Sequence, residues 1–359
     1  MRFICNQSEI TGAIQTVSRA MAASRSAIQL LEGIYIGAEE DALRLKCMNM
    51  SLQIKTRISV QVLEEGEIVL PGRLFSEVIR RLPPGEIEIR VGENASATIS
   101  CGTSRTTLQG LSASEFPSMP DFNGNPPIQL EQSMLKDMIK RTVFATAHDE
   151  TKPVLTGALL ELSGHSALMV ALDGYRLALR KEEALETENT EYRVVLPAKS
   201  LNEIAKVLGD EAETAIYGSQ GYMRFEMGET SIVSRLLEGE FIKYDQIIPK
   251  EYTTRAVVQS GTLCASIERA SLLAREGQNN LIKLFISEEG ISVTSQSELG
   301  NAFESVNCDF EGKELEIAFN AAYVLDVLRV LENETVVLDF NSSVSPLVIH
   351  PAEGAAFTY

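Results

Sequence analysis

The sequence predicts an α+β protein made of three similar domains in a row. Residues 70–83 read LPGRLFSEVIRRLP, and residues 196–208, which begin 126 positions later, read LPAKSLNEIAKVL. A third helix of this kind begins at Phe319, 122 positions after Pro197. In each copy an amphipathic helix is followed by short strands of alternating polarity. A period this long describes repeated domains rather than the short units of a solenoid.

Each domain begins with a further helix and a strand pair. Polar-capped helical segments occupy 7–20, 132–145 and 259–272, and alternating strand pairs follow at 33–48, 158–172 and 282–295. The repeating order is therefore helix, strands, helix, strands, which predicts two helices packed on antiparallel sheets in every domain. We expect domains at 1–122, 128–249 and 250–359.

Length and composition agree with this organisation. A chain of 359 residues with 44% apolar and 23% charged residues can build two or three ordinary cores. The N-terminus has no apolar signal segment, and no apolar run approaches the roughly 18 residues that span a bilayer. We therefore expect a soluble, cytoplasmic protein without membrane contact. The five cysteines are scattered and form no CxxC pair, which argues against a disulfide framework and a zinc site.

Positive charge is concentrated in the predicted helices. The net charge is −18, but the segments 6–21, 70–83, 131–147, 197–208, 259–276 and 319–331 hold 12 basic and 8 acidic residues. Those segments carry +4, so the rest of the chain carries −22. For a single helix, a solvated basic face is the more ordinary explanation. A set of basic helix faces in so acidic a chain instead favours contact with a phosphate backbone.

Helical spacing divides the charged residues from the apolar ones. In the segment 70–83 an apolar stripe is expected to face the core, made of Leu74, Phe75, Val78, Ile79 and Leu82. The opposite face carries Arg73, Glu77, Arg80 and Arg81. In the segments 131–147 and 197–208 the outward basic residues are Lys136, Lys140, Arg141, Lys199 and Lys206.

An enzyme is one alternative that the residues argue against. His148, His165 and His350 are far apart and have no metal-ligand spacing such as HExxH. The motifs GxxxxGK[ST], GxGxxG and GxSxG are absent from the sequence. We expect no catalytic residue, no metal and no cofactor.

Four segments resemble the bacterial DNA polymerase III beta subunit family, the sliding clamps. They are ALDGYRLALR at 171–180, LPAKSLNEIAKVL at 196–208, GEFIKYDQIIP at 239–249 and FNAAYVLDVL at 319–328. The resemblance covers the whole chain in order. It implies a homodimer in which two chains join head to tail as a closed ring around double-stranded DNA. Such a ring would tether the replicative polymerase and other replication and repair proteins. The alternative is a three-domain scaffold that does not bind DNA.

The resemblance also implies a pocket for short linear motifs of polymerases and clamp loaders. From the residues alone, Asp173-Gly174 between apolar runs is more simply a two-residue hairpin turn. Leu172, Tyr175, Ile242 and Gln246 depart from the residues usual in the family. We expect Arg176 at the rim, meeting a carboxylate or carbonyl of the motif. The implied pocket residues are Leu155, Leu172, Gly174, Tyr175, Arg176, Leu177, Ile242, Gln246, Ile247, Tyr323, Val344 and Pro346.

The resemblance also implies a feature of the chain's end, a dimer interface and a DNA-facing surface. The chain stops at Tyr359, where the family continues into a last strand, so we expect that strand of the third domain to be missing.

The dimer interface is expected at Arg105, Leu108, Leu272 and Leu273. The expected DNA-facing residues are Arg25, Arg73, Arg80, Lys136, Lys140 and Lys199.

Overall fold

The computed structural model describes residues 1–23, 27–120, 122, 126–149, 151–183, 191–276, 279–331, 334–354 and 356–359. Arg25, one of the expected DNA-facing residues, lies outside these ranges. The chain forms two compact units. The first unit contains the described parts of Met1–Leu135 and Lys199–Leu237, and the second those of Lys136–Glu186, Glu191–Ala198 and Glu238–Tyr359.

Two antiparallel sheets build the first unit. The smaller has the strand order β5 (Gln61–Glu64), β1 (Arg2–Asn6), β7 (Glu86–Val91), β8 (Ser96–Cys101) and β9 (Ser104–Gln109). The larger runs β10 (Ile128–Glu131), β15 (Glu213–Ser219), β16 (Tyr222–Met227), β17 (Thr230–Arg235), β4 (Leu52–Ser59), β3 (Ala42–Met48), β2 (Gly33–Glu39) and β6 (Gly66–Pro71).

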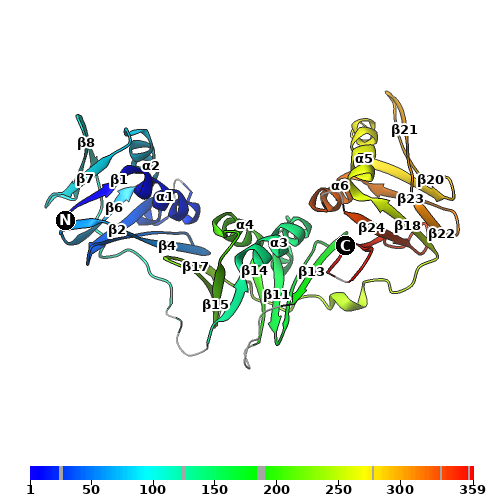
Figure 1. The fold of residues 1–359 in the computed structure, drawn as a ribbon, viewed down its shortest axis with the longest axis horizontal. Helices are drawn as coiled ribbons and strands as arrows, with labels where there is room; N and C mark the ends of the chain where they lie inside the picture. The colour runs from blue at the N-terminus through cyan, green and yellow to red at the C-terminus, as the bar shows by residue number, and fades with distance from the viewer. Residues whose placement is uncertain are drawn as a thin grey trace. The chain divides into compact units, whose positions relative to one another are not determined.

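The larger sheet joins two of the sequence repeats. Strand β17 pairs with β4 in antiparallel register from Thr230 opposite Thr56 to Ser234 opposite Leu52, and the two strands lie side by side in Figure 1. The hydroxyl groups of Thr56 and Thr230 lie 2.9 Å apart across this junction. Backbone hydrogen bonds therefore continue without a break from the first repeat into the second.

Two helices of the first domain pack against each other. Helix α1 (Gln7–Val17) begins at Asn6, whose Oδ1 accepts a hydrogen bond from the Ser8 amide. Helix α2 (Gly72–Arg81) buries Phe75 and Ile79, one turn apart, as the apolar stripe predicts. Leu74 does not belong to that stripe, because its side chain lies beyond the buried edge and is 54% exposed.

The second unit holds three sheets. The first has the order β14 (Tyr192–Pro197), β11 (Gly157–Ser163), β12 (Ser166–Leu172), β13 (Leu177–Glu183) and β26 (Phe357–Thr358). The second runs β22 (Asp309–Gly312), β18 (Thr254–Gln259), β24 (Thr335–Phe340) and β25 (Val348–Pro351). The third runs β21 (Gly300–Val306), β20 (Gly290–Ser297), β19 (Leu281–Ser287) and β23 (Leu315–Asn320).

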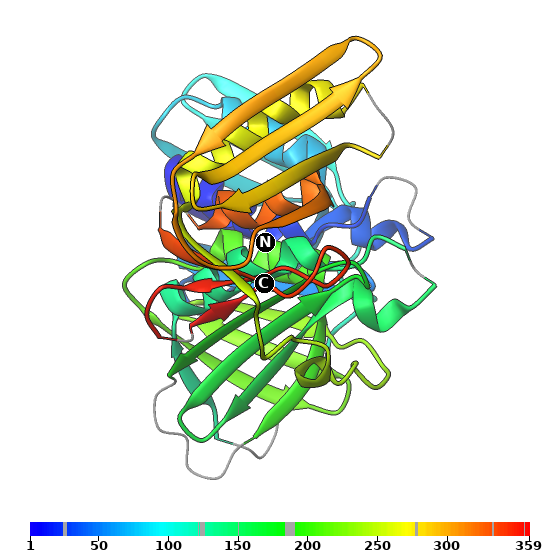
Figure 2. The same cartoon turned by 90° about the vertical axis from the view of Figure 1, so that its right-hand side faces the viewer.

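The helices of the third domain cover its sheets. Helix α5 (Ser260–Ala274) packs on β19, β20 and β21, as Figure 2 shows for the yellow helix against the orange strands. Helix α6 (Ala321–Val330) packs against α5 and begins at Asn320, whose Oδ1 caps the Ala322 amide. With α3 (Gln132–Thr142) and α4 (Ala198–Val207), all six predicted helices are confirmed, and so is the α+β class.

A short strand, β26, lies at the C-terminal end of the described chain. Phe357–Thr358 forms β26, which pairs with Leu179 and Arg180 of β13. The Tyr359 and Ile349 amides each donate to the other's carbonyl, at 2.9 and 3.0 Å. These bonds connect β25 of the third domain to the sheet of the central one.

Candidate functional site

The turn between β12 and β13 differs by one position from the predicted hairpin. Leu172 pairs with Leu177, and the Asp173 amide donates to the Arg176 carbonyl at 3.2 Å, so the two central residues are Gly174 and Tyr175. Gly174 has φ 96°, a conformation that favours glycine. The Asp173 carboxylate accepts from the Tyr175 and Arg176 amides at 2.9 and 3.1 Å. The turn thereby presents Tyr175 outward, 83% exposed.

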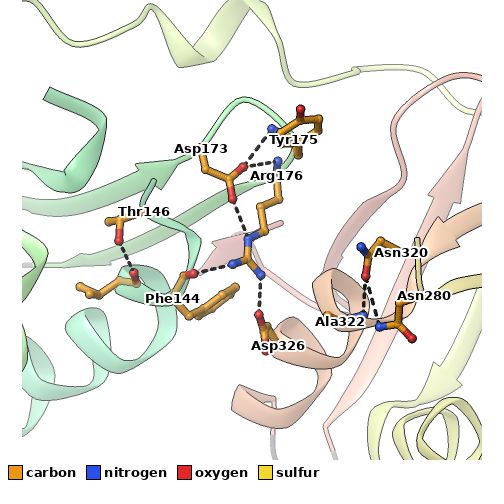
Figure 3. A network of polar contacts seen from close by, with 10 residues as sticks. Phe144, Thr146, Asp173, Tyr175, Arg176, Asn280, Asn320, Ala322 and Asp326 are labelled. Atoms are coloured by element: carbon orange, nitrogen blue, oxygen red, sulfur yellow. Dashed lines mark hydrogen bonds and ion pairs between the residues drawn. The ribbon is translucent and has the colours of Figure 1, made fainter. Parts of the chain in front are cut away.

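Arg176 connects this turn to two other segments (Figure 3). Its Nε donates to Asp173 Oδ2 at 3.1 Å, its Nη1 to Asp326 Oδ2 of α6 at 2.6 Å, and its Nη2 to the Phe144 carbonyl at 2.8 Å. Only 12% of its side chain is exposed. Each guanidinium nitrogen therefore has an acceptor inside the protein, two of which are charged.

Aromatic rings surround the same guanidinium. Its central carbon lies 4.8 Å from the centre of the Tyr323 ring and 5.5 Å from that of Phe144, distances typical of cation–π contacts. The Tyr323 ring in turn stacks with Tyr175, with centres 6.0 Å apart and planes at 25°. Arg176 therefore packs against the Tyr323 ring, and the Tyr323 ring packs against the exposed Tyr175 ring.

A largely apolar pocket of about 390 Å³ lies beside this stack. Its walls come from the β12–β13 turn, the segment after η5 (Tyr244–Gln246), helix α6, strand β25 and the C-terminal residues. A concave apolar site with a few polar groups is the usual form of a binding pocket. The residues that line it include Leu172, Gly174, Tyr175, Arg176, Leu177, Ile247, Ile248, Pro249, Phe319, Asn320, Tyr323, Val327, Pro346, Val348, Ile349, Thr358 and Tyr359.

A second hollow, of about 700 Å³, lies in the first unit between α1, α2 and α4. We call it the helix cleft. It is lined by α1 and the residues that follow it, by one face of α2, and by Glu203 of α4. Arg19, Arg73 and Arg80 contribute positive charge to its walls, and Glu77 and Glu203 contribute negative charge. Such a mixed but mainly basic wall is suited to an anionic partner.

The comparisons with known proteins agree over the whole chain. Residues 1–120 match the N-terminal domain of the DNA polymerase III beta subunit, 129–243 its central domain and 245–359 its C-terminal domain. This chain belongs to the DNA polymerase III beta-subunit family. Its relatives include the beta sliding clamp of Bacillus subtilis, 35% identical over 361 residues, which cover 97% of this chain and 95% of the relative.

Further relatives point the same way. The beta sliding clamp of Synechococcus elongatus is 34% identical over 370 residues, covering 100% of this chain and 98% of the relative. Among solved structures, the DNA polymerase sliding clamp from Bacillus subtilis matches with TM-score 0.96 at 33% identity, covering 100% of this chain and 97% of that one. The Pseudomonas aeruginosa sliding clamp bound to griselimycin has TM-score 0.94 at 28% identity, with the same coverage.

The structure brings most of the expected pocket residues of this family member together, but not all. Leu172, Gly174, Tyr175, Arg176, Leu177, Ile247, Tyr323 and Pro346 line the pocket. Leu155 is instead a core residue, 3% exposed. Ile242, Gln246 and Val344 lie outside the lining, and Val344 is 92% exposed.

Two expectations about arginines need correction. Arg176 does not project from the rim, because its nitrogens are taken up by Asp173, Asp326 and Phe144. Arg141 is not part of an outward basic face. It is 15% exposed and bonded to Asp137 at 2.8 Å and Glu334 at 2.7 Å. Burial opposes its charge, but these carboxylates outweigh burial and raise the pKa of Arg141.

The remaining basic candidates lie where helical spacing predicts. Arg73, Arg80, Lys140 and Lys199 are exposed and Lys136 is half-buried. In the third domain, Arg269 of α5 bonds Glu304, and Arg329 of α6 bonds Glu268. By residue count, the segments that contain α5 and α6 carry no net charge. The excess of positive charge in the helices therefore comes from the segments of α2, α3 and α4.

The expected interface residues lie near two sheet edges, one in each unit. In the first unit β9 is an edge strand, on which Arg105 is exposed, whereas Leu108 is 5% exposed and packs inside its own domain. In the second unit β21 is an edge strand near the end of α5, where Leu272 is 63% exposed and Leu273 is half-buried. Two further apolar side chains near this edge, Leu299 and Phe303, are 76% and 69% exposed.

Two further kinds of feature were sought among the described residues, a metal site and a membrane span. No group of three or more potential metal ligands occurs within the described ranges. In the same part of the chain, no helix has the length and apolar character to cross a membrane. Phe319, Val327 and Tyr359 line the pocket but are not among the expected pocket residues. Phe319 lies on β23 and Val327 on α6, where the alternating or helical apolar pattern already accounts for them, and Tyr359 follows β26. Their sequence context therefore gave no separate signal.

Proposed function

We propose that this chain is a DNA sliding clamp, in which two copies join head to tail as a ring around duplex DNA. The family match from residue 1 to residue 359, in three consecutive domains, is the observation that carries the proposal. In it the domains are 1–122, 128–249 and 250–359, and the protein acts by tethering rather than by catalysis. A head-to-tail contact produces a closed ring only when the rotation between copies returns to its start.

Cations of α2, α3 and α4 would contact the DNA. Arg73, Arg80, Lys136, Lys140 and Lys199 belong to helices that carry the chain's excess of positive charge. Contacts to phosphate carry no sequence information, so they suit a protein that moves along any duplex.

The pocket beside Tyr175 and Tyr323 would hold a short motif of the replicative polymerase, the clamp loader or a repair protein. A volume of about 390 Å³ accommodates a few apolar side chains. The accessible apolar walls at Leu177 and Ile247 support this assignment. A peptide with leucine or phenylalanine anchors would be fixed by apolar contact, and backbone hydrogen bonds would orient it.

The edge strands β9 and β21 support the dimer. Each presents unpaired backbone groups within its own sheet, which a strand from another chain can complete. Apolar Leu272, Leu299 and Phe303 near β21 would be covered in such a contact.

The test loads the full-length protein onto a circular duplex and then cuts the DNA once. A ring should be retained on the circle at high salt and lost after the cut, because it slides off the ends. Equal retention on cut and uncut DNA would contradict encirclement. A solution mass of one chain, 39.4 kDa, would instead favour a monomeric scaffold.

A further inference from the structure

Two glutamates lie among the cations of the helix cleft. On α2, Glu77 Oε1 accepts from Arg80 Nη2 at 2.5 Å, and its Oε2 accepts from Arg81 Nε at 3.2 Å. On α4, Glu203 Oε1 accepts from Lys206 Nζ at 2.7 Å, and its Oε2 lies 3.5 Å from Arg19 Nη1. Each carboxylate is thus shared between two cations.

Arg73 is the exception in this cleft. It makes no ion pair with any residue that the structure describes, whereas Arg19 and Arg80 of the same lining do. Arg81 and Lys206, which do not line the cleft, are paired with the same two glutamates. Of these five cations, four would have to leave or share a carboxylate in order to meet a phosphate. The surface is therefore less attractive to DNA than its number of arginines and lysines suggests.

The carboxylate of Glu77 is well suited to hold its charge. A hydrogen bond from Arg80 and the positive charges of Arg80 and Arg81 lower its pKa below the ordinary value. It is also accessible, with 48% of its side chain exposed, so incoming phosphate competes with it directly. Glu203, at 27% exposed, reaches from α4 to the residues that follow α1.

We propose that Glu77 and Glu203 limit the strength of DNA contact by competing with phosphate for the cations of the helix cleft. The inference rests on the proposed function, because it assumes that this face meets the duplex. An arginine that exchanges a carboxylate for a phosphate gains only the difference between two charge-assisted hydrogen bonds. A repulsion between each glutamate and the phosphate further reduces the gain.

Such weakening has a mechanical consequence. A ring that moves along DNA must break its phosphate contacts at every step, so strong contacts raise the barrier to movement. Topology already keeps a closed ring on the duplex, and high affinity adds nothing to retention. Internal carboxylate partners keep the arginines oriented while holding each phosphate contact weak.

The test compares full-length Glu77→Gln, Glu203→Gln and the double variant with wild type. Binding to a short labelled duplex is measured by fluorescence anisotropy over a series of KCl concentrations. Each single variant should bind about two- to five-fold more tightly, the range expected for an exposed ion pair. The double variant should show a steeper salt dependence, by about one counterion for each additional phosphate contact.

Glu229→Gln is the matched control. Glu229 is also an exposed glutamate of the first unit, 3.9 Å from Arg57, but it does not line the helix cleft. The same loss of one negative charge should leave its affinity near wild type. Melting temperatures of all variants should stay within a degree or two, because Glu77 and Glu229 are exposed and Glu203 is half-buried outside the core.

Three results would overturn the inference. One is unchanged affinity of the double variant, and another is weaker binding, which would mean that the glutamates position the arginines for DNA. The third is an equal gain in Glu229→Gln, which would reflect only the total charge. Failure of the proposed function looks different, since wild-type protein would then not be retained on a closed circle.

Discussion

At the scale of single residues, Arg176 is a structural connection rather than a free ligand for a partner. Its three nitrogens donate to Asp173, Asp326 and the Phe144 carbonyl, and its flat face supports Tyr323. Lysine could not reproduce this arrangement, because an ammonium group lacks the planar set of donors. The pocket wall therefore depends on an ion pair that joins the β12–β13 turn to α6.

We predict that Arg176→Met lowers the free energy of unfolding by about 2–4 kcal/mol, since it leaves carboxylates and a carbonyl without their donor. Urea denaturation measures the loss. Arg193→Met is the control, because Arg193 pairs with Glu161 but is 53% exposed, and its loss should stay below about 1 kcal/mol. If Arg176→Met abolished peptide binding with no loss of stability, Arg176 would contact the motif directly.

The pocket walls allow a second residue-scale prediction. Leu177 is half-buried and Ile247 is 52% exposed, so both side chains can be changed without opening the core. Leu177→Lys combined with Ile247→Lys should abolish binding of a polymerase-derived pentapeptide, because the peptide's apolar anchors would face two charges. Isothermal titration calorimetry measures the affinity.

The control for this pair is Met50→Lys, which adds the same kind of charge at a side chain 71% exposed in the first unit. Its peptide affinity and melting temperature should match wild type. Unchanged peptide affinity in the pocket double variant would show that the motif binds elsewhere.

At the scale of elements, the sheet that contains β25 is held by a polar network. Arg255 on β18 donates to Asp339 of β24 through Nε at 2.6 Å and Nη2 at 2.8 Å, and its guanidinium lies 3.8 Å from the Tyr252 ring centre. His350 Nε2 of β25 lies 3.0 Å from the same carboxylate. Val348 and Ile349 of β25 line the pocket, so this network stabilises one of its walls.

Asp339 leads to a pH prediction. Burial acts to raise its pKa, but hydrogen bonds from Arg255 and His350 prevail and lower it below the ordinary 3.8. A lowered pKa adds stability above the unfolded value, and this stability is lost as pH falls through the folded value. Asp339→Asn should therefore lower stability at pH 7 by about 1–2 kcal/mol, and the difference should narrow below about pH 4.

Thermal melts between pH 3 and pH 7 measure this difference. Asp309→Asn, at an exposed position of β22 in the same sheet, should follow the wild-type curve at every pH. A deficit in Asp339→Asn that stayed constant down to pH 3 would mean that the Asp339 charge does not supply the stability.

At the scale of the whole molecule, the exposed apolar residues near β21 predict how two chains meet. If two chains join at this edge as proposed, Leu273→Asp and Phe303→Asp should each convert the dimer to a 39.4 kDa monomer, because a buried charge without a partner opposes association. Sedimentation equilibrium measures the mass. A dimer that survived both changes would remove this edge from the interface.

Leu63→Asp is the control for these variants. Leu63 is 42% exposed on β5, at the edge of its sheet opposite to β9. Leu63→Asp places the same charge on β5, the edge of this sheet that is not proposed to join the partner chain. The dimer should persist in this variant. Circular dichroism should show that all three variants keep their secondary structure.

The local sequence pattern was sufficient to predict the helices and strands and their order along the chain. The apolar spacing of residues 70–83 and its copies predicts helices whose bounds agree with α2, α4 and α6 to within a few residues. The turn at Asp173 was also predictable in kind, although its centre lies one residue later. Both features depend on contacts between residues close together in the chain.

What only the tertiary structure decided is the role of side chains whose partners are distant in sequence. The helical spacing alone predicts that Arg141 is an outward cation, but Glu334 bonds it in a half-buried ion pair. The sequence alone predicts that Arg176 is a rim residue. In the structure its Nη1 lies 2.6 Å from Asp326 Oδ2 of α6, which holds it inward. Helical spacing indicates which way a side chain points, but not what the fold brings to meet it. Charge and apolar pattern therefore determined the repeats, while long-range packing determined which residues form the pocket wall.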